Sequence, residues 1–189
     1  MNLLFIGDVV GQSGCDFLES RMYKLKREYD IDVTVVNGEN SAQGNGITPQ
    51  SYRQLLNIGA DVVTTGNHSF RRREAEELYD TNEQLLRPAN YPEGVMGHGV
   101  TYIDMCPYKI AVVNLMGTMY MEAVENPFNY VDKLLESIDT PNIIVDFHAE
   151  TTSEKKAMGF YLQKRCTAVL GTHTHVQTAD EMILGGHTA

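Results

Sequence analysis

The sequence predicts a layered α/β fold in which strands alternate with helices. Short apolar runs typical of buried strands, such as Leu3–Ile6 and Ile143–Phe147, are separated by amphipathic segments with helical spacing. Polar residues follow the strands at their carboxyl ends, which is where α/β proteins bind ligands. Two further runs, Gly99–Ile103 and Lys109–Val113, predict a hairpin, so some antiparallel pairing is expected in the sheet.

Composition limits the classes of protein that this chain can be. Its 189 residues, of which 42% are hydrophobic, are enough to bury a core, so residues 1–189 are expected to form one domain. A net charge of -10 disfavours duplex DNA as a partner but is compatible with a small phosphate ester. Three widely spaced cysteines favour a reducing cytoplasm. No run approaches the ~20 apolar residues of a membrane span, and the N-terminus predicts a strand instead of a signal peptide.

Five of the predicted strands are followed by side chains that can bind a metal or take part in proton transfer. Turn residues alone would explain Asn, Asp and Gly after any one strand. The recurrence of Glu, Asn and His at the same topological position favours a site. The strands and the residues after them are Leu3–Ile6 with Asp8, Val33–Val36 with Glu39 and Asn40, Val62–Thr65 with Asn67 and His68, Ile143–Phe147 with His148, and Ala168–Leu170 with His173 and His175.

The last of these segments, Gly171–His175, carries two histidines. In an extended backbone His173 and His175 would project to the same side, which is a metal-binding geometry. Gly171 would mark the point where the strand gives way to a loop that needs unusual backbone freedom.

Charged runs, apolar spacing and capping residues predict where the helices lie and where they begin. The basic run Arg71–Arg73, which precedes several glutamates, is expected on a solvated helix face, although one arginine could reach a phosphate from beside His68. The first helix is expected to bury Phe17 or Leu18, Met22, Leu25 and Tyr29. The expected starts are Ser13, Thr48-Pro49, Asn126-Pro127 and Ser153, the last for a helix that continues through Arg165.

Together these strand ends offer mixed oxygen and imidazole ligands. Such donors suit Mn, Fe or Zn better than Mg or Ca, which prefer oxygen alone. The set is too large for one ion and about right for two, and a carboxylate such as Glu39 can bridge a pair. Paired ions recur in displacement at phosphorus, where a metal-bound water becomes the hydroxide nucleophile. The candidates are Asp8, Glu39, Asn40, Asn67, His68, His148, His173 and His175.

The order of these blocks resembles the five-block signature of calcineurin-like metallophosphoesterases. Within that superfamily the chain is most similar to the YmdB-like branch of 2′,3′-cyclic nucleotide phosphodiesterases. Like that branch, it has Val10 where other members carry a His and Glu39 where they carry an Asp. The blocks that carry this second similarity are Phe5–Gly11, Asn37–Asn40, Arg87–Asn90, Asp146–Glu150 and Gly171–Thr178.

The resemblance covers nearly the whole chain and implies a layered metallophosphoesterase-type fold with the metal site at the carboxyl ends of the strands. Members of the family continue for several more strands beyond the point that corresponds to Ala189. The chain is therefore expected to be either C-terminally truncated or a naturally short member.

The resemblance also implies a role for each site residue. Asp8, Asn40 and His175 would hold one ion, Asn67, His148 and His173 the other, and Glu39 would bridge them. His68 would face the substrate, as a general acid for the leaving oxygen or as a donor to the phosphoryl group. It is not expected to be a metal ligand, because the adjacent residues Asn67 and His68 cannot easily face one ion.

We therefore expect a metal-dependent phosphoric diester hydrolase with two divalent ions, Fe or Mn in preference to Zn. Its expected substrates are small cyclic nucleotides such as 2′,3′-cAMP. Two alternatives stay open: a phosphomonoesterase or nucleotidase with the same site, and a metal-stabilised regulatory scaffold with little activity. A homo-oligomer and an RNA-processing protein partner stay open as well, whereas no membrane association is expected.

Overall fold

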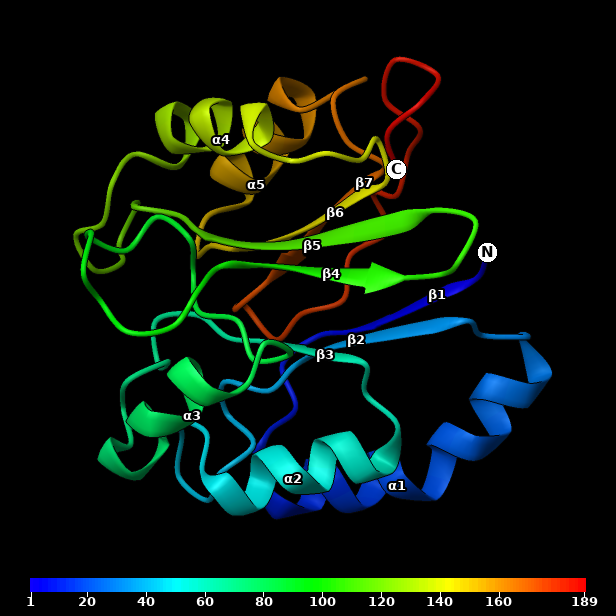
Figure 1. The fold of residues 1–189 in the computed structure, drawn as a ribbon, viewed down its shortest axis with the longest axis vertical. Helices are drawn as coiled ribbons and strands as arrows, with labels where there is room; N and C mark the ends of the chain where they lie inside the picture. The colour runs from blue at the N-terminus through cyan, green and yellow to red at the C-terminus, as the bar shows by residue number, and fades with distance from the viewer.

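The structure, a computed structural model, describes residues 1–189 and arranges them in four layers (Figure 1). Helices α1, α2 and α3 cover one sheet, α4 and α5 cover a second sheet, and the two sheets pack against each other. This confirms the predicted layered α/β class. In chain order the elements are β1 (Leu3–Ile6), α1 (Gly11–Glu28), β2 (Val33–Asn37), α2 (Pro49–Ile58), β3 (Val62–Thr64), the 3-10 turn η1 (Arg73–Ala75), α3 (Glu76–Thr81), β4 (Val100–Asp104), β5 (Lys109–Met116), α4 (Pro127–Glu136), β6 (Ile143–His148), α5 (Thr152–Tyr161) and β7 (Ala168–Thr172).

The two sheets differ in the number and direction of their strands. One contains the parallel strands β1, β2 and β3 in that order. The other has the order β4-β5-β6-β7, in which β5, β6 and β7 are parallel and β4 is an antiparallel edge strand. The predicted hairpin is confirmed as β4 and β5, with Val100 opposite Val113. Carboxyl ends of parallel strands share one edge of a sheet, so the residues that follow them are brought together.

Three apolar clusters hold the layers together. The central cluster lies between the sheets and includes Val35 of one sheet and Ile110 and Ile144 of the other. The outer clusters join each sheet to its own helices, for example Leu55 of α2 with Val63 and Met158 of α5 with Val145. Each fully buried aliphatic side chain contributes about 1.5–3 kcal/mol. Packing on both faces makes each sheet a rigid support for the residues at its strand ends.

The first helix begins earlier than its sequence predicts. It starts at Gly11, no side chain caps it, and Ser13 is an exposed residue of its first turn. Hydrogen bonds from the backbone N–H groups of Val9 and Gly11 to the β2 end and the loop after it fix the entry of the chain, so no cap is required. Tyr29, expected on the buried face, is instead exposed at the helix end. The residues that the helix buries are Cys15, Leu18 and Met22.

Two more predictions about helices are wrong in detail. Helix α5 is capped by Thr151, whose hydroxyl oxygen accepts a hydrogen bond from the N–H of Glu154, and it ends at Tyr161. Ser153 therefore lies inside it, and Arg165 lies beyond it. The run Arg71–Arg73 lies in the connection after β3 and at the start of η1, not on a regular helix face.

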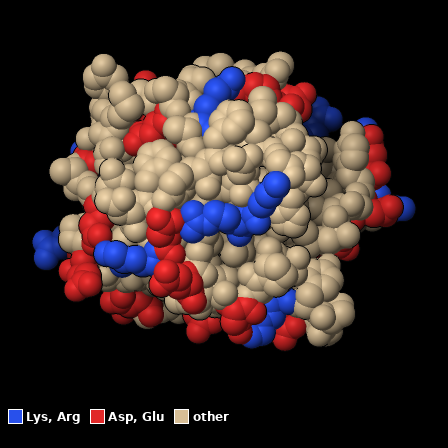
Figure 2. All heavy atoms as spheres, turned by 90° about the horizontal axis from the view of Figure 1, so that it is seen from above, with Lys and Arg blue, Asp and Glu red and all other residues tan.

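The length and apolar character of the helices, and the charges on the surface, are relevant to binding of membranes and nucleic acids. No helix combines the length and the apolar character that crossing a membrane requires. On the face formed by α4 and α5, acidic and basic side chains lie among each other and form no broad basic area (Figure 2).

The cap of α2 provides a stability test. Thr48 accepts a hydrogen bond from the N–H of Ser51 at 3.1 Å in a reciprocal capping box. Thr48→Ala should therefore lower the free energy of unfolding by about 1 kcal/mol. Ser13→Ala is the matched control and should leave stability unchanged, because Ser13 caps nothing. Urea unfolding of both variants checks this, and equal losses would contradict the assigned helix starts.

Candidate metal centre

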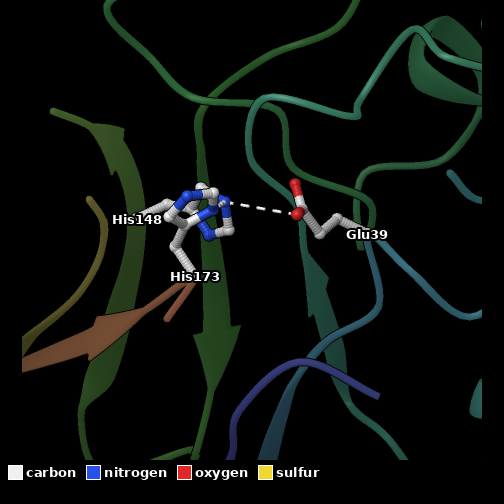
Figure 3. Close-up of side chains that lie close together, drawn as sticks. All are labelled: Glu39, His148 and His173. Atoms are coloured by element: carbon white, nitrogen blue, oxygen red, sulfur yellow. Dashed lines mark hydrogen bonds and ion pairs between the residues drawn. The ribbon is translucent and has the colours of Figure 1, made fainter. Parts of the chain in front are cut away.

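The centre of the site is formed by Glu39, His148 and His173 (Figure 3). One ligand atom from each residue lies within 4.8 Å of the others. Glu39 follows β2, His148 ends β6 and His173 follows β7, so the two sheets contribute ligands from opposite sides. Glu39 and His148 are fully buried. The group therefore sits at the junction of the two sheets, at their carboxyl edges.

A first subgroup surrounds Asp8. His175 Nε2 lies 3.0 Å from Asp8 Oδ2, and Asn40 Nδ2 lies 3.4 Å from the same oxygen. The other carboxylate oxygen of Asp8 accepts a hydrogen bond from the backbone N–H of His173 at 3.1 Å. Asp8 thus ties the end of β1 to the loop after β7.

A second subgroup surrounds Nε2 of His148. Asn67 Oδ1 and His173 Nδ1 each lie 3.1 Å from this nitrogen, and Glu39 Oε1 lies 3.3 Å from it. One ring nitrogen carries at most one proton, so it can donate to only one of these three neighbours at a time. A cation among these atoms would satisfy all of them, and the donor set therefore fits a divalent metal.

Glu39 connects the two subgroups. Its Oε1 atom also accepts a hydrogen bond from Asn40 Nδ2 at 3.0 Å. The structure thus brings all eight predicted site residues into one cluster, and their roles as metal ligands or general acid remain predictions. An ion held by Asn40 would take its amide oxygen, so the amide would have to turn, because Nδ2 now faces Asp8 and Glu39.

His68 lies at the rim of this cluster. Its side chain is 28% exposed, and its Nδ1 lies 2.9 Å from Asn40 Oδ1. Its backbone N–H donates to Glu39 Oε2 at 3.1 Å. With Nδ1 directed at the Asn40 amide, Nε2 is the ring nitrogen left for a group bound in the adjoining cavity.

The backbone of the segment Gly171–His175 differs from the prediction. Gly171 lies within β7, and it is His173 and His175 that adopt positive φ, at 92° and 49°. They do not reach the site by alternation along an extended strand. Non-glycine residues are strained in this region and persist only where the surroundings fix them. Here the bonds of Asp8 to the His173 N–H and to the His175 ring provide that constraint.

Two residues behind His148 were missed by the sequence analysis. Thr172 Oγ1 lies 2.8 Å from His148 Nδ1 and donates its own proton to Asp146 Oδ1 at 2.7 Å. The threonine oxygen can therefore only accept from His148, which places a proton on Nδ1 and leaves Nε2 as the nitrogen that faces Glu39 and would give up its proton to hold an ion. Asp146 stands two residues before His148 in β6, and this spacing on one strand face was the available signal.

Glu150 plays the corresponding part for His173. Its Oε2 lies 2.9 Å from His173 Nε2, which leaves Nδ1 facing His148.

Gly66 is also necessary for the site, because a Cβ atom at this position would lie 2.1 Å from His148 Cδ2. No larger residue fits between β3 and these ligands.

The electrostatics favour a cation. Burial alone would raise the pKa of the Glu39 carboxyl group, but hydrogen bonds with His148 and His68 hold this pKa well below its usual range. The hydrogen bond to Glu39 in turn raises the pKa of His68, against the effect of burial. Desolvation raises the pKa of Asp146 to about 6 despite its hydrogen bonds. Glu39 therefore stays ionised and attracts positive charge.

A cavity of about 290 Å³ opens beside the ligand cluster. It is large enough for a small polar substrate and contains neither lysine nor arginine among its lining residues. These residues are Val10, Gly11, Glu39, Asn40, Ala42, Gly44, Asn45, His68, His173 and His175.

The sequence and the fold of this chain are similar to those of known proteins. The profile of the family described as "YmdB-like protein" matches residues 4–189. The 2′,3′-cyclic-nucleotide 2′-phosphodiesterase of Bacillus subtilis (strain 168) is 46% identical over 191 residues, which cover 100% of this chain and 72% of that protein.

Two crystal structures have the same fold. A hypothetical protein from Thermus thermophilus aligns with a TM-score of 0.94 at 39% identity, over 100% of this chain and 73% of that one. A structure described as a novel phosphatase of Mycoplasma pneumoniae aligns with a TM-score of 0.93 at 32% identity, over 98% of this chain and 69% of that one. The chain therefore corresponds to only part of the length of these relatives.

The Thr172 hydroxyl group allows a test of the proton placement on His148. Thr172→Val keeps the side-chain shape but removes the acceptor for the Nδ1 proton, so Mn²⁺ affinity should fall by about 10–100-fold. Thr174→Val is the control from the same loop, since Thr174 bonds to Lys155 and not to a histidine. Titration calorimetry with Mn²⁺ measures both. Equal affinities in the two variants would show that Thr172 does not orient His148.

Proposed function

The chain belongs to the YmdB-like family, and from this membership we propose that it is a dinuclear-metal phosphodiesterase for small cyclic nucleotides such as 2′,3′-cAMP. The chain is a phosphoric ester hydrolase, as its phosphodiesterase relative with 46% identity indicates. The observation that carries the proposal is the convergence of Glu39, His148 and His173 from both sheets. A buried group of this kind has the donor types that Fe, Mn and Zn prefer.

The contacts support a division of the ligands into two sets. Asp8 lies against Asn40 and His175, and we assign these three to one ion. Asn67, His148 and His173 lie against one another and are assigned to the second. Glu39 Oε1 approaches both sets and would bridge the ions. Fe or Mn is the proposed metal, with Zn as the alternative.

When bound, the ions would supply a water nucleophile at neutral pH and neutralise charge on the phosphoryl oxygens. The residues of the chain orient the substrate and move the proton. His68 can donate a proton from Nε2 to the leaving oxygen, because its Nδ1 is directed at the Asn40 amide and Nε2 is left for the cavity. A bond forms between phosphorus and the water oxygen, which gives up one proton to solvent, while the P–O2′ bond breaks and the proton from His68 goes to O2′. His68 then regains a proton from solvent, so that the sum of the steps adds one water to the cyclic phosphate. The product is the nucleoside 3′-phosphate.

A phosphomonoesterase is the second candidate. The Mycoplasma pneumoniae relative is described as a phosphatase, and the same ligand set would serve both reactions. The cleft walls, not the ligands, select between a diester and a monoester. Assaying 2′,3′-cAMP beside adenosine 3′-phosphate distinguishes the two.

The role of His68 is tested by replacement. His68→Ala should lower kcat for 2′,3′-cAMP in Mn²⁺ by about 100-fold or more, because a positioned proton donor typically contributes 10²–10⁴-fold. Bound metal should be unchanged, since His68 is not a proposed ligand. His187→Ala is the control, because His187 is exposed and outside the cluster.

Two outcomes of this assay would count against the proposal. If the wild-type chain binds Mn²⁺ but hydrolyses no phosphate diester, the reaction class is wrong. If His68→Ala retains full kcat, hydrolysis proceeds without this proton donor and the role of His68 is wrong.

A further inference from the structure

The three arginines of the run Arg71–Arg73 have different surroundings. Arg71 and Arg73 are exposed, whereas Arg72 is half-buried. The Nε atom of Arg72 donates to the carbonyl oxygen of Asn45 at 2.9 Å, and its Nη2 atom donates to that of Gln43 at 2.5 Å. Its guanidinium group is therefore committed to a protein loop. The possibility that an arginine of this run binds the substrate phosphate does not fit Arg72.

The loop that Arg72 holds, residues 42–46, is wrapped closely around its side chain. A Cβ atom at Gly46 would lie 2.8 Å from Arg72 Cγ, and one at Gly44 would lie 3.2 Å from Arg72 Nη2. Both glycines have positive φ, at 96° for Gly44 and 79° for Gly46. Within the loop, one backbone hydrogen bond, from Ala42 N–H to Gly46, closes the turn. A glycine-rich loop with so few internal bonds needs an outside group to fix its position.

The same loop forms one wall of the cavity beside the metal ligands. Ala42, Gly44 and Asn45 line that wall, and His68 lines the same cavity. Arg72 follows His68 by four residues, and the N–H of Arg71 bonds to the His68 carbonyl oxygen at 3.0 Å. One short segment, residues 68–72, thus carries both the proposed proton donor and the side chain that holds the loop wall of the same cavity.

The chemistry of this wall indicates what it can bind. The cavity has no lysine or arginine in its lining, so it offers no permanently charged side chain to a second phosphate. Asn45 presents an amide with both a donor and an acceptor, and Val10 presents an apolar surface. These groups suit the base and ribose of a nucleotide that carries only one phosphate.

We propose that loop 42–46 is the nucleoside-binding wall of the site and that Arg72 is the positioning residue that holds it. This inference rests on the proposed function, since the phosphate would be held by the metal centre. The substrates would be nucleosides with a single phosphate, in preference to nucleoside di- or triphosphates.

Kinetics of matched variants test the inference. With Mn²⁺, Arg72→Gln should raise KM for 2′,3′-cAMP by about tenfold, because the wall that positions the nucleoside is no longer fixed. Its activity on methyl p-nitrophenyl phosphate, a diester without a nucleoside, and its bound metal should change by less than about twofold. Arg72→Lys should show an intermediate KM, since one ammonium group cannot reproduce the two-donor fork. Arg73→Gln is the control and should match the wild type.

Equal KM values for Arg72→Gln and Arg73→Gln would overturn the inference, as would an equal loss on both substrates. If the wild type hydrolyses neither diester, the proposed function fails, and the brace is then tested by hydrogen exchange. The amides of residues 42–46 should exchange at least about tenfold faster in Arg72→Gln than in Arg73→Gln. Unchanged exchange would show that Arg72 does not hold the loop.

Discussion

A buried carboxylate facing a buried imidazole is the contact on which the rest of the site depends. Glu39 belongs to the loop after β2 in one sheet and His148 to β6 in the other, and their side-chain atoms lie 3.3 Å apart. Charges removed from water are costly unless opposite charge and hydrogen bonds compensate them. The two sheets must therefore pack with their carboxyl edges aligned, because only that arrangement supplies each group with its partner.

Behind this contact, a set of buried polar side chains continues across the interface of the sheets. Asp146 of β6 accepts hydrogen bonds from Asn37 of β2, Thr64 of β3 and Thr172 of β7. Thr172, held by Asp146, in turn fixes the orientation of the His148 ring through the contact of its hydroxyl oxygen with Nδ1. Such networks favour one arrangement only when every member is satisfied. Apolar packing supplies the stability of the four layers, and this network determines how the ligands at the strand ends are aimed.

The strands and the clustering of the eight candidate residues could be predicted from the sequence, but the side chains that orient those residues could not. The strands were recognisable because their apolar runs are short and end in Gly, Asn, His or a carboxylate, and the Thr48 and Asn126 caps precede a proline. The start of α1 was predicted wrongly at Ser13. It is fixed by backbone hydrogen bonds from Val9 and Gly11 to residues distant in the sequence, which a local sequence pattern does not reveal. Asp146 and Thr172 were missed because their partners come from distant strands. The positive φ of His173 likewise depends on Asp8, 165 residues away.

We propose that this chain holds two metal ions at the junction of its sheets. The most direct test is the metal content of the purified chain after saturation with Mn²⁺ and removal of free ions, measured by elemental analysis together with protein concentration. We expect two tightly bound ions per chain. One ion per chain would contradict the division of the ligands into two sets, and none would contradict the metal centre itself.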